Sequence, residues 1–219
     1  MYEDYTLGLA LMDFVPVILS GIALIMFSKM ISIRSRSAGQ TALMGGLLVL
    51  GGGLCKATWK TLVVVIGQDI TVLNNLLWLL MAPGFTLFFA ALLQWSLHAS
   101  HKAPKILPIV MSLAVFGVGY YFFRTQADSR IWFLVLLGAT VLFSTGSSIT
   151  LMIHSAKVKI WLAFVFLLAN VVCSFTMSYL ARLPEQTAAL QWIEEGLNIV
   201  SQGSFLIAAI MLYRNAKTD

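Results

Sequence analysis

Two lysines stand inside a stretch of sequence that is otherwise apolar enough to cross a membrane. Lys56 and Lys60 lie one helical turn apart within residues 47–67, so a helix here places both on one face. A charge held inside a bilayer is costly, and such a residue is usually functional and has a partner nearby. Its ammonium group can pair with a carboxylate or bind an anionic solute. The two lysines therefore indicate buried ion pairing, solute binding, or both.

Carboxylates occur at matching depth in other apolar segments. Asp13 lies in the first segment, and Glu194 and Glu195 lie near the start of the last. At a rise of about 1.5 Å per residue, Lys60 and the two glutamates fall roughly 9–11 Å below the same membrane face. We expect a cavity that is open to this face, with lysines on one wall and carboxylates on the other. Four further polar residues are expected to line it, namely Asn75, Tyr179, Asn198 and Gln202.

The same charges allow a second interpretation, in which they only orient the helices. Lys60 would then pair with Glu194 or Glu195, and Lys56 with Asp13. Buried ion pairs can do this without binding any ligand, and their net stabilisation is often small.

Seven apolar runs can position these residues. The chain of 219 residues is 59% hydrophobic and 11% charged, with a mean hydropathy of +0.89, which lies outside the range of soluble globular proteins. Each run approaches the roughly 20 residues that a spanning helix needs. The short connections favour antiparallel packing of consecutive helices. We predict an all-α integral membrane protein with a single domain and helices at about residues 9–33, 41–66, 70–97, 106–123, 131–153, 160–183 and 188–213.

Most lysines and arginines gather at one end of these predicted helices. That end carries Lys29, Arg34, Arg36, Lys102, Lys105, Lys157, Lys159, Arg214 and Lys217. The positive-inside rule assigns it to the cytoplasm, so the N-terminus is expected outside and the C-terminus inside. The net charge of +5 follows from this bias and does not indicate nucleic-acid binding. We expect the plasma membrane, which is the inner membrane of a bacterium.

The first three and the last three helices appear as an internal repeat when the chain is shifted by about 118 residues. The matches include Ser37-Ala38 with Ser155-Ala156, Cys55 with Cys173, and Thr58 with Thr176. Triplets at about 9–97 and 130–213 are joined by a linker helix at about 104–123, so they share an orientation. This parallel 3+1+3 layout resembles the sugar transporters of the SWEET type and, more loosely, the microbial rhodopsins. The resemblance implies an architecture and no activity, and the last helix has no lysine to hold retinal.

Small and helix-breaking residues fall near the middle of two predicted helices. They are Gly51-Gly52-Gly53 and Pro83-Gly84, with Asn170 and Gln202-Gly203 as their approximate counterparts in the second triplet. Breaks at corresponding positions of two repeats indicate a transporter site. The alternative is close packing, because small residues let helix backbones approach each other.

Other possible sites have weaker support. His98, His101 and His154 lie at helix ends without a carboxylate beside them, so we do not expect a zinc site. Cys55 and Cys173 lie in apolar segments and indicate no disulfide framework. No motif identifies a cofactor or a catalytic residue.

We therefore expect a membrane protein that binds a small polar or zwitterionic solute from the outer side. The same arrangement would also allow it to transport that solute across the membrane. Lys56 and Lys60 would meet an anionic group, and Asp13, Glu194 or Glu195 would meet a cation or exchange protons. One alternative is a seven-helix sensor or accessory subunit that acts through a partner protein. Another is an intramembrane enzyme. A homo-oligomer or a membrane partner protein is compatible with each of them.

Overall fold

The computed structural model describes residues 6–96, 106–125, 131–180, 183 and 187–218. Within these residues, seven helical spans are long and apolar enough to cross a membrane, which confirms the predicted number. The first span consists of two helices and each of the others of one. The helices are α1 (Leu7–Met12), α2 (Phe14–Arg34), α3 (Arg36–Ile66), α4 (Thr71–Ser96), α5 (Leu107–Thr125), α6 (Ile131–Lys157), α7 (Trp161–Leu180) and α8 (Ala188–Thr218). His98, His101, Lys102 and Lys105 lie outside the described residues.

The first span is interrupted at Asp13, which the hydropathy pattern does not predict. Asp13 ends α1 and precedes α2, and its backbone stays in the right-handed helical region (φ −57°, ψ −26°). Pro16 explains the interruption, because it has no N–H to donate to the carbonyl of Met12 and its ring crowds that carbonyl. An acidic residue therefore stands where the helical hydrogen bonding of this span is interrupted.

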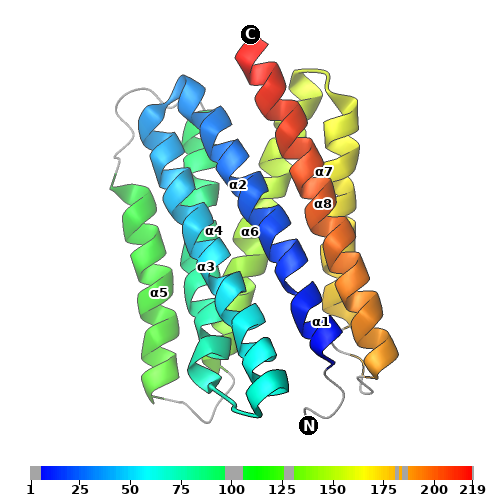
Figure 1. The fold of residues 1–219 in the computed structure, drawn as a ribbon. Coiled ribbons are helices and arrows are strands. Elements are labelled where there is room, and N and C mark those ends of the chain that lie inside the picture. The colour runs from blue at the N-terminus through cyan, green and yellow to red at the C-terminus, as the bar shows by residue number, and fades with distance from the viewer. Residues whose placement is uncertain (1–5, 97–105, 126–130, 181–182, 184–186, 219) are drawn as a thin grey trace.

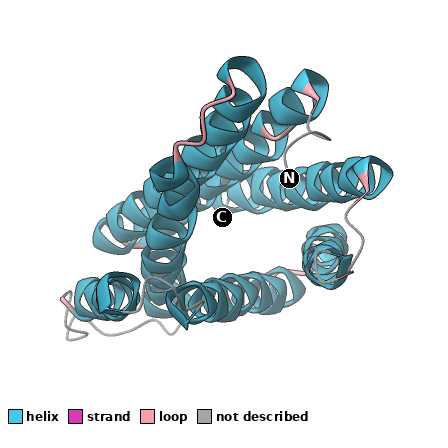
Figure 2. Cartoon of the chain, turned by 90° about the horizontal axis from the view of Figure 1, so that it is seen from below, coloured by secondary structure: helices cyan, strands magenta, loops and turns pink. Residues whose placement is uncertain are grey.

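The spans form a ring. Consecutive spans pack against each other, as the short connections predict, and α2 also packs against α8. The ring runs through α2, α3, α4, α6, α7 and α8, while α5 packs against α4 and α6 (Figure 1). Figure 2 shows the same bundle from its lower end. Residues that are distant in sequence can therefore meet in the interior of the ring.

The half of the interior nearer the C-terminal end of the bundle is filled by apolar side chains. Phe27 of α2 lies at its centre, and its ring centroid is 6.3 Å from that of Phe88 and 5.0 Å from that of Phe205. All three rings are buried, together with small residues of α3 and α8 that pack around them. The aromatic group of Phe27, Phe88 and Phe205 thus closes the interior on this side.

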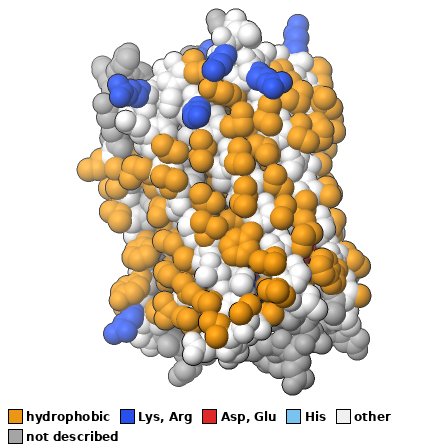
Figure 3. Space-filling view, viewed as in Figure 1, with side chains coloured by type: hydrophobic (Ala, Val, Ile, Leu, Met, Phe, Trp, Pro, Cys, Tyr) orange, Lys and Arg blue, Asp and Glu red, His pale blue; other side chains and the backbone are white. Residues whose placement is uncertain are grey.

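The outer surface of the bundle is that of a membrane protein. In the view of Figure 3, hydrophobic side chains cover the middle of the bundle, and most of the visible Lys and Arg side chains lie at the end from which the C-terminus emerges. This agrees with the predicted charge bias. The side of the membrane that each end faces and the 3+1+3 repeat stay predictions.

The central glycines serve close helix packing. A Cβ on Gly45 would lie 2.5 Å from the carbonyl oxygen of Gly84, and a Cβ on Gly84 would lie 2.8 Å from that of Gly45. The helices α3 and α4 therefore cross here with their backbones in contact. A Cβ on Gly52 would likewise approach the Leu77 carbonyl oxygen at 2.9 Å. Helix α3 continues through Gly51-Gly52-Gly53, so these residues mark a helix crossing and not a break.

Candidate ligand and ion site

An ion-paired cluster lies inside the ring, in the half that contains the N-terminal end of the chain. The ammonium nitrogen of Lys60 is 2.9 Å from Oδ2 and 3.0 Å from Oδ1 of Asp13. It is also 3.7 Å from Oε1 of Glu195. Lys60 and Asp13 are only 7% and 8% exposed, so this contact is shielded from both lipid and water. The cluster joins the first, second and last spans.

Three spans with two kinds of backbone setting bring these side chains together. Asp13 lies at the α1–α2 interruption, while Lys60 and Glu195 belong to uninterrupted helices. Helix α3 is capped by Gly67, whose φ of 67° provides the left-handed conformation common after a helix. Lys60 is therefore about two turns, or roughly 10 Å, from the end of its helix. At this depth an unpaired ammonium would be costly, and the two carboxylates compensate it.

The cluster contains more acid than base. Lys56 and Lys60 both act electrostatically on Glu194 and on Glu195, so these four side chains and Asp13 form one charged group. With all of them ionised, three carboxylates face two ammonium groups. Two of their buried oxygens, Oε1 of Glu194 and Oε2 of Glu195, have no hydrogen-bond partner among the described residues. The arrangement thus retains acceptors that a cation, a proton or a donor group of a solute could use.

The structure brings three of the expected site residues into direct contact. Asp13, Lys60 and Glu195 are in contact, with Lys60 rather than Lys56 as the partner of Asp13. Lys56 is exposed and makes no ion pair within the described part of the chain. The remaining expected residues comprise the half-buried Asn75, Glu194, Asn198 and Gln202 and the exposed Tyr179.

A second polar group lies farther along the interior, and of its polar side chains only Asn170 and Gln202 were singled out from the sequence. It surrounds a cavity of about 160 Å³ bounded by α4, α6, α7 and α8. Its lining contains five hydroxyl side chains of one helix, α6, and polar side chains of α7 and α8. The lining residues are Met81, Phe85, Thr140, Ser144, Thr145, Ser147, Ser148, Asn170, Val171, Ser174, Gln202 and Phe205. We call this space the hydroxyl cavity.

Asn170 fixes one wall of the hydroxyl cavity. Its Nδ2 donates to the carbonyl oxygen of Ser201 at 3.1 Å and to the hydroxyl of Ser201 at 2.9 Å. Ser148 donates to Oδ1 of Asn170 at 3.4 Å, and the hydroxyls of Ser174 and Ser201 are 3.3 Å apart. These hydrogen bonds link α6, α7 and α8 through side chains that could also bind a polar solute.

The hydroxyl side chains of α6 were not identified from the sequence, because serine and threonine change the hydropathy of an apolar run very little. Ser147 donates to the carbonyl of Phe143 at 2.7 Å, and Thr140 donates to that of Leu136 at 2.8 Å. Satisfied within their own helix, such side chains cost little in a membrane span. The available signal was their spacing, since Thr140, Ser144, Ser147 and Ser148 recur at intervals of one turn and share a face of α6.

One face of α8 connects the two polar groups. Glu195, Asn198 and Gln202 are spaced so that they lie above one another on a helix. Glu195 contacts Lys60 at one end of this row, and Gln202 lines the hydroxyl cavity at the other. The row spans two turns, or about 10 Å. It forms a polar path that ends where the aromatic group of Phe27, Phe88 and Phe205 begins, because Phe205 also lines the cavity.

Comparison with known proteins adds no assignment. No protein-family model, curated protein or solved structure matches this chain. Among the described residues, no group of three His, Cys, Asp or Glu side chains is arranged to hold a metal ion.

Proposed function

We propose that this membrane protein binds a small polar or zwitterionic solute in the interior of its helix ring and transports it across the membrane. The proposal depends on one observation, the polar path along α8. This path leads from the ion-paired cluster at Glu195 to the hydroxyl cavity at Gln202. Polar side chains are costly at this depth, and a continuous row of them is typical of a solute or ion pathway.

The contacts suggest separate roles for the charged residues. Lys60 is already compensated by Asp13 and Glu195, so we assign it to holding the three spans together. Lys56 is exposed and has no ion-pair partner in the described residues, and we assign it to binding an anionic group. Glu194 has a buried oxygen without a partner, which suits a cationic group of the same solute. A zwitterion would satisfy both charges at once.

The aromatic group of Phe27, Phe88 and Phe205 gives this path a closed end. Its rings fill the interior beyond the hydroxyl cavity. A path that is polar on one side of the membrane and sealed by apolar packing on the other corresponds to one state of an alternating-access transporter. Release of solute at the opposite face would require these rings to separate.

The test is uptake into proteoliposomes over a panel of amino acids, sugars and organic ions. Lys56→Met removes the charge assigned to the solute, and we expect it to lower the uptake of the transported solute at least roughly ten-fold, the effect of losing one charged hydrogen bond. Lys29→Met makes the same chemical change at an exposed position of α2 on the opposite half of the bundle and should leave uptake unchanged. Equal uptake by wild-type protein and Lys56→Met would refute the assigned role.

The sensor alternative predicts a different pattern in the same experiment. A sensor would bind a solute of the panel, with binding sensitive to Lys56→Met, and would show no flux above that of protein-free liposomes. Isothermal titration of the detergent-purified protein measures that binding separately from transport.

A further inference from the structure

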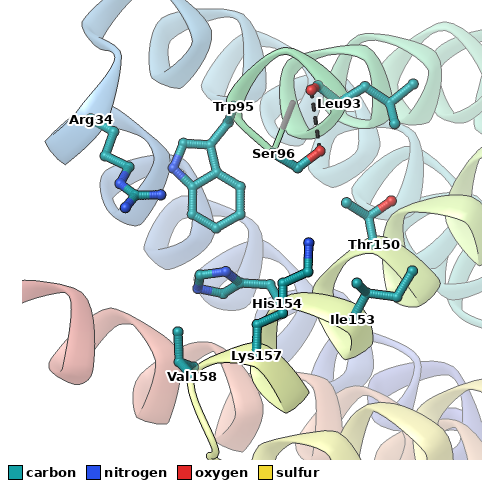
Figure 4. Close-up of a pocket in the computed structure, with 9 residues that line it drawn as sticks. All are labelled: Arg34, Leu93, Trp95, Ser96, Thr150, Ile153, His154, Lys157 and Val158. Atoms are coloured by element: carbon teal, nitrogen blue, oxygen red, sulfur yellow. Dashed lines mark hydrogen bonds between the residues drawn. The ribbon is translucent and has the colours of Figure 1, made fainter. Parts of the chain in front are cut away.

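A second and larger pocket lies at the opposite end of the bundle from the ion-paired cluster. It has a volume of about 460 Å³ and is formed where α2, α4 and α6 end (Figure 4). Its lining combines basic, hydroxyl and apolar side chains. The residues are Arg34, Leu93, Trp95, Ser96, Thr150, Ile153, His154, Lys157 and Val158. We call this the basic pocket.

The two positive charges of the basic pocket are not neutralised by the described residues that line it. Arg34 is the last residue of α2 and Lys157 the last of α6, and neither makes an ion pair or a hydrogen bond within the described residues. No acidic side chain is found among the described residues that line it. Figure 4 shows both side chains extending toward the space around Trp95 and His154. Of the described lining residues, an anion entering here would meet two with positive charge and none with negative charge.

Basic residues alone would not indicate a ligand, because cations in the last turn of a helix are stabilised by the helix dipole. Trp95 is the independent observation. It is 6% exposed, and its indole N–H has no hydrogen-bond partner among the described residues. Its ring packs edge-on against His154, with centroids 4.5 Å apart. A buried donor without an acceptor is rare, and indole can only donate, so this N–H lacks an acceptor that a ligand in the pocket could supply.

We infer that the basic pocket binds a phosphate group, supplied by an anionic phospholipid or by a soluble phosphate. The fork of Arg34 matches two phosphate oxygens, and Lys157 adds a point charge. The indole N–H of Trp95 donates to a third oxygen. All three groups are donors, which selects an anion over a neutral solute.

The apolar part of the lining accommodates the rest of such a ligand. Leu93, Ile153 and Val158 line the pocket, and Ile153 is 52% exposed on the outside of the bundle. The pocket therefore reaches a surface that lipid chains contact. It also lies at helix ends, the level of phospholipid headgroups, where basic pockets between spanning helices bind anionic lipids.

The experiment measures binding to delipidated protein in detergent by native mass spectrometry and by the shift in thermal unfolding temperature. The probes are phosphatidic acid, phosphatidylcholine and inorganic phosphate. The variants are Trp95→Phe, which keeps an aromatic ring at this position and removes the donor, and the double variant Arg34→Gln/Lys157→Gln. Arg214→Gln/Lys217→Gln is the matched control, because it removes two charges at the same end of the bundle outside the pocket.

We expect the wild-type protein to bind phosphatidic acid in preference to phosphatidylcholine. The pocket double variant should weaken this binding roughly thirty-fold, since each basic residue near the membrane surface contributes about 1 kcal/mol. Trp95→Phe should weaken it roughly ten-fold, the effect of one hydrogen bond to a charged group. The control pair should bind like the wild-type protein.

The same binding measurements distinguish a soluble phosphate from a phospholipid as the source of the phosphate group. Stabilisation by inorganic phosphate that is lost in Arg34→Gln/Lys157→Gln would support the site with a soluble ligand, and binding of phosphatidic acid alone would support it with a lipid. Equal loss of binding in the pocket and control pairs, or no preference for phosphatidic acid together with no response to inorganic phosphate, would overturn the inference.

Discussion

The carboxylate of Asp13 contacts the ammonium of Lys60 at 2.9 Å, although 47 positions separate them in the sequence. This contact joins the interruption in the first span to the interior of the second. Glu195 adds the last span through the same ammonium. One buried lysine therefore links three spans, and its removal should affect both stability and any function of the polar path.

Lys60→Met should lower the free energy of unfolding by about 3–5 kcal/mol, because it leaves Asp13 and Glu195 without their shared cation. Adding Asp13→Asn should recover part of this loss. Denaturant titration in mild detergent measures both effects, and the double-mutant cycle isolates the pair. Lys56→Met is the matched control and should change stability by less than about 1 kcal/mol, since Lys56 is exposed. A similar loss in both single lysine variants would contradict the assigned contacts.

Gly45→Ala should destabilise the bundle by about 1–3 kcal/mol, because the new methyl group would have to push α3 away from α4. The clash is with backbone, the Gly84 carbonyl oxygen at 2.5 Å, so a rotamer change cannot relieve it. Gly138→Ala provides the control, since its Cβ would meet no atom within 4 Å and alanine favours the helix. The unfolding temperatures of the two variants are compared by circular dichroism. The packing argument fails if Gly45→Ala unfolds no earlier than Gly138→Ala.

Gln202→Leu should lower solute uptake roughly ten-fold while leaving the thermal stability close to that of the wild-type protein, because it removes one polar group from the hydroxyl cavity. Gln202 lines this cavity and is half-buried, so leucine fits without a large packing change. Gln40→Leu makes the same replacement at an exposed position of α3 and should retain uptake. The two variants are compared by uptake into proteoliposomes at equal protein density. Unchanged transport by Gln202→Leu would exclude the cavity from the solute path.

A single cysteine at position 217 should react with a membrane-impermeant maleimide only after the cells are permeabilised. One at position 68, at the other end of the bundle, should react in intact cells. This follows from the positive-inside rule, which assigns the end rich in Lys and Arg to the cytoplasm. The variants are Lys217→Cys and Gln68→Cys, made after Cys55 and Cys173 are replaced by alanine. The reverse labelling pattern would mean that the polar path opens to the cytoplasm.

Hydropathy and depth predict the helices and the charged cluster because both are set by the membrane. A span must be apolar over its whole length, so seven runs give seven spans. Residues at equal depth that face the interior can meet, and Lys60 and Glu195 do so. Depth does not define rotation about a helix axis, and this is why Asp13 could be assigned to the wrong lysine.

Two features could not be obtained from hydropathy or depth. The hydroxyl cavity depends on which faces of α6, α7 and α8 turn inward, and its serines and threonines resemble apolar residues in a hydropathy profile. The basic pocket depends on Trp95, whose buried N–H becomes notable only once its surroundings are known. In both cases the missing information is packing, which the pattern of a single segment does not contain.

The contact between α2 and α8 has a consequence for how the protein is made. Since α2 and α8 close the ring together, the ring stays open until the ribosome has synthesised α8. Asp13 and Lys60 enter the membrane well before Glu195 is synthesised. A prematurely terminated product would therefore expose its polar interior to lipid, and cellular quality-control proteases could distinguish it from the finished protein.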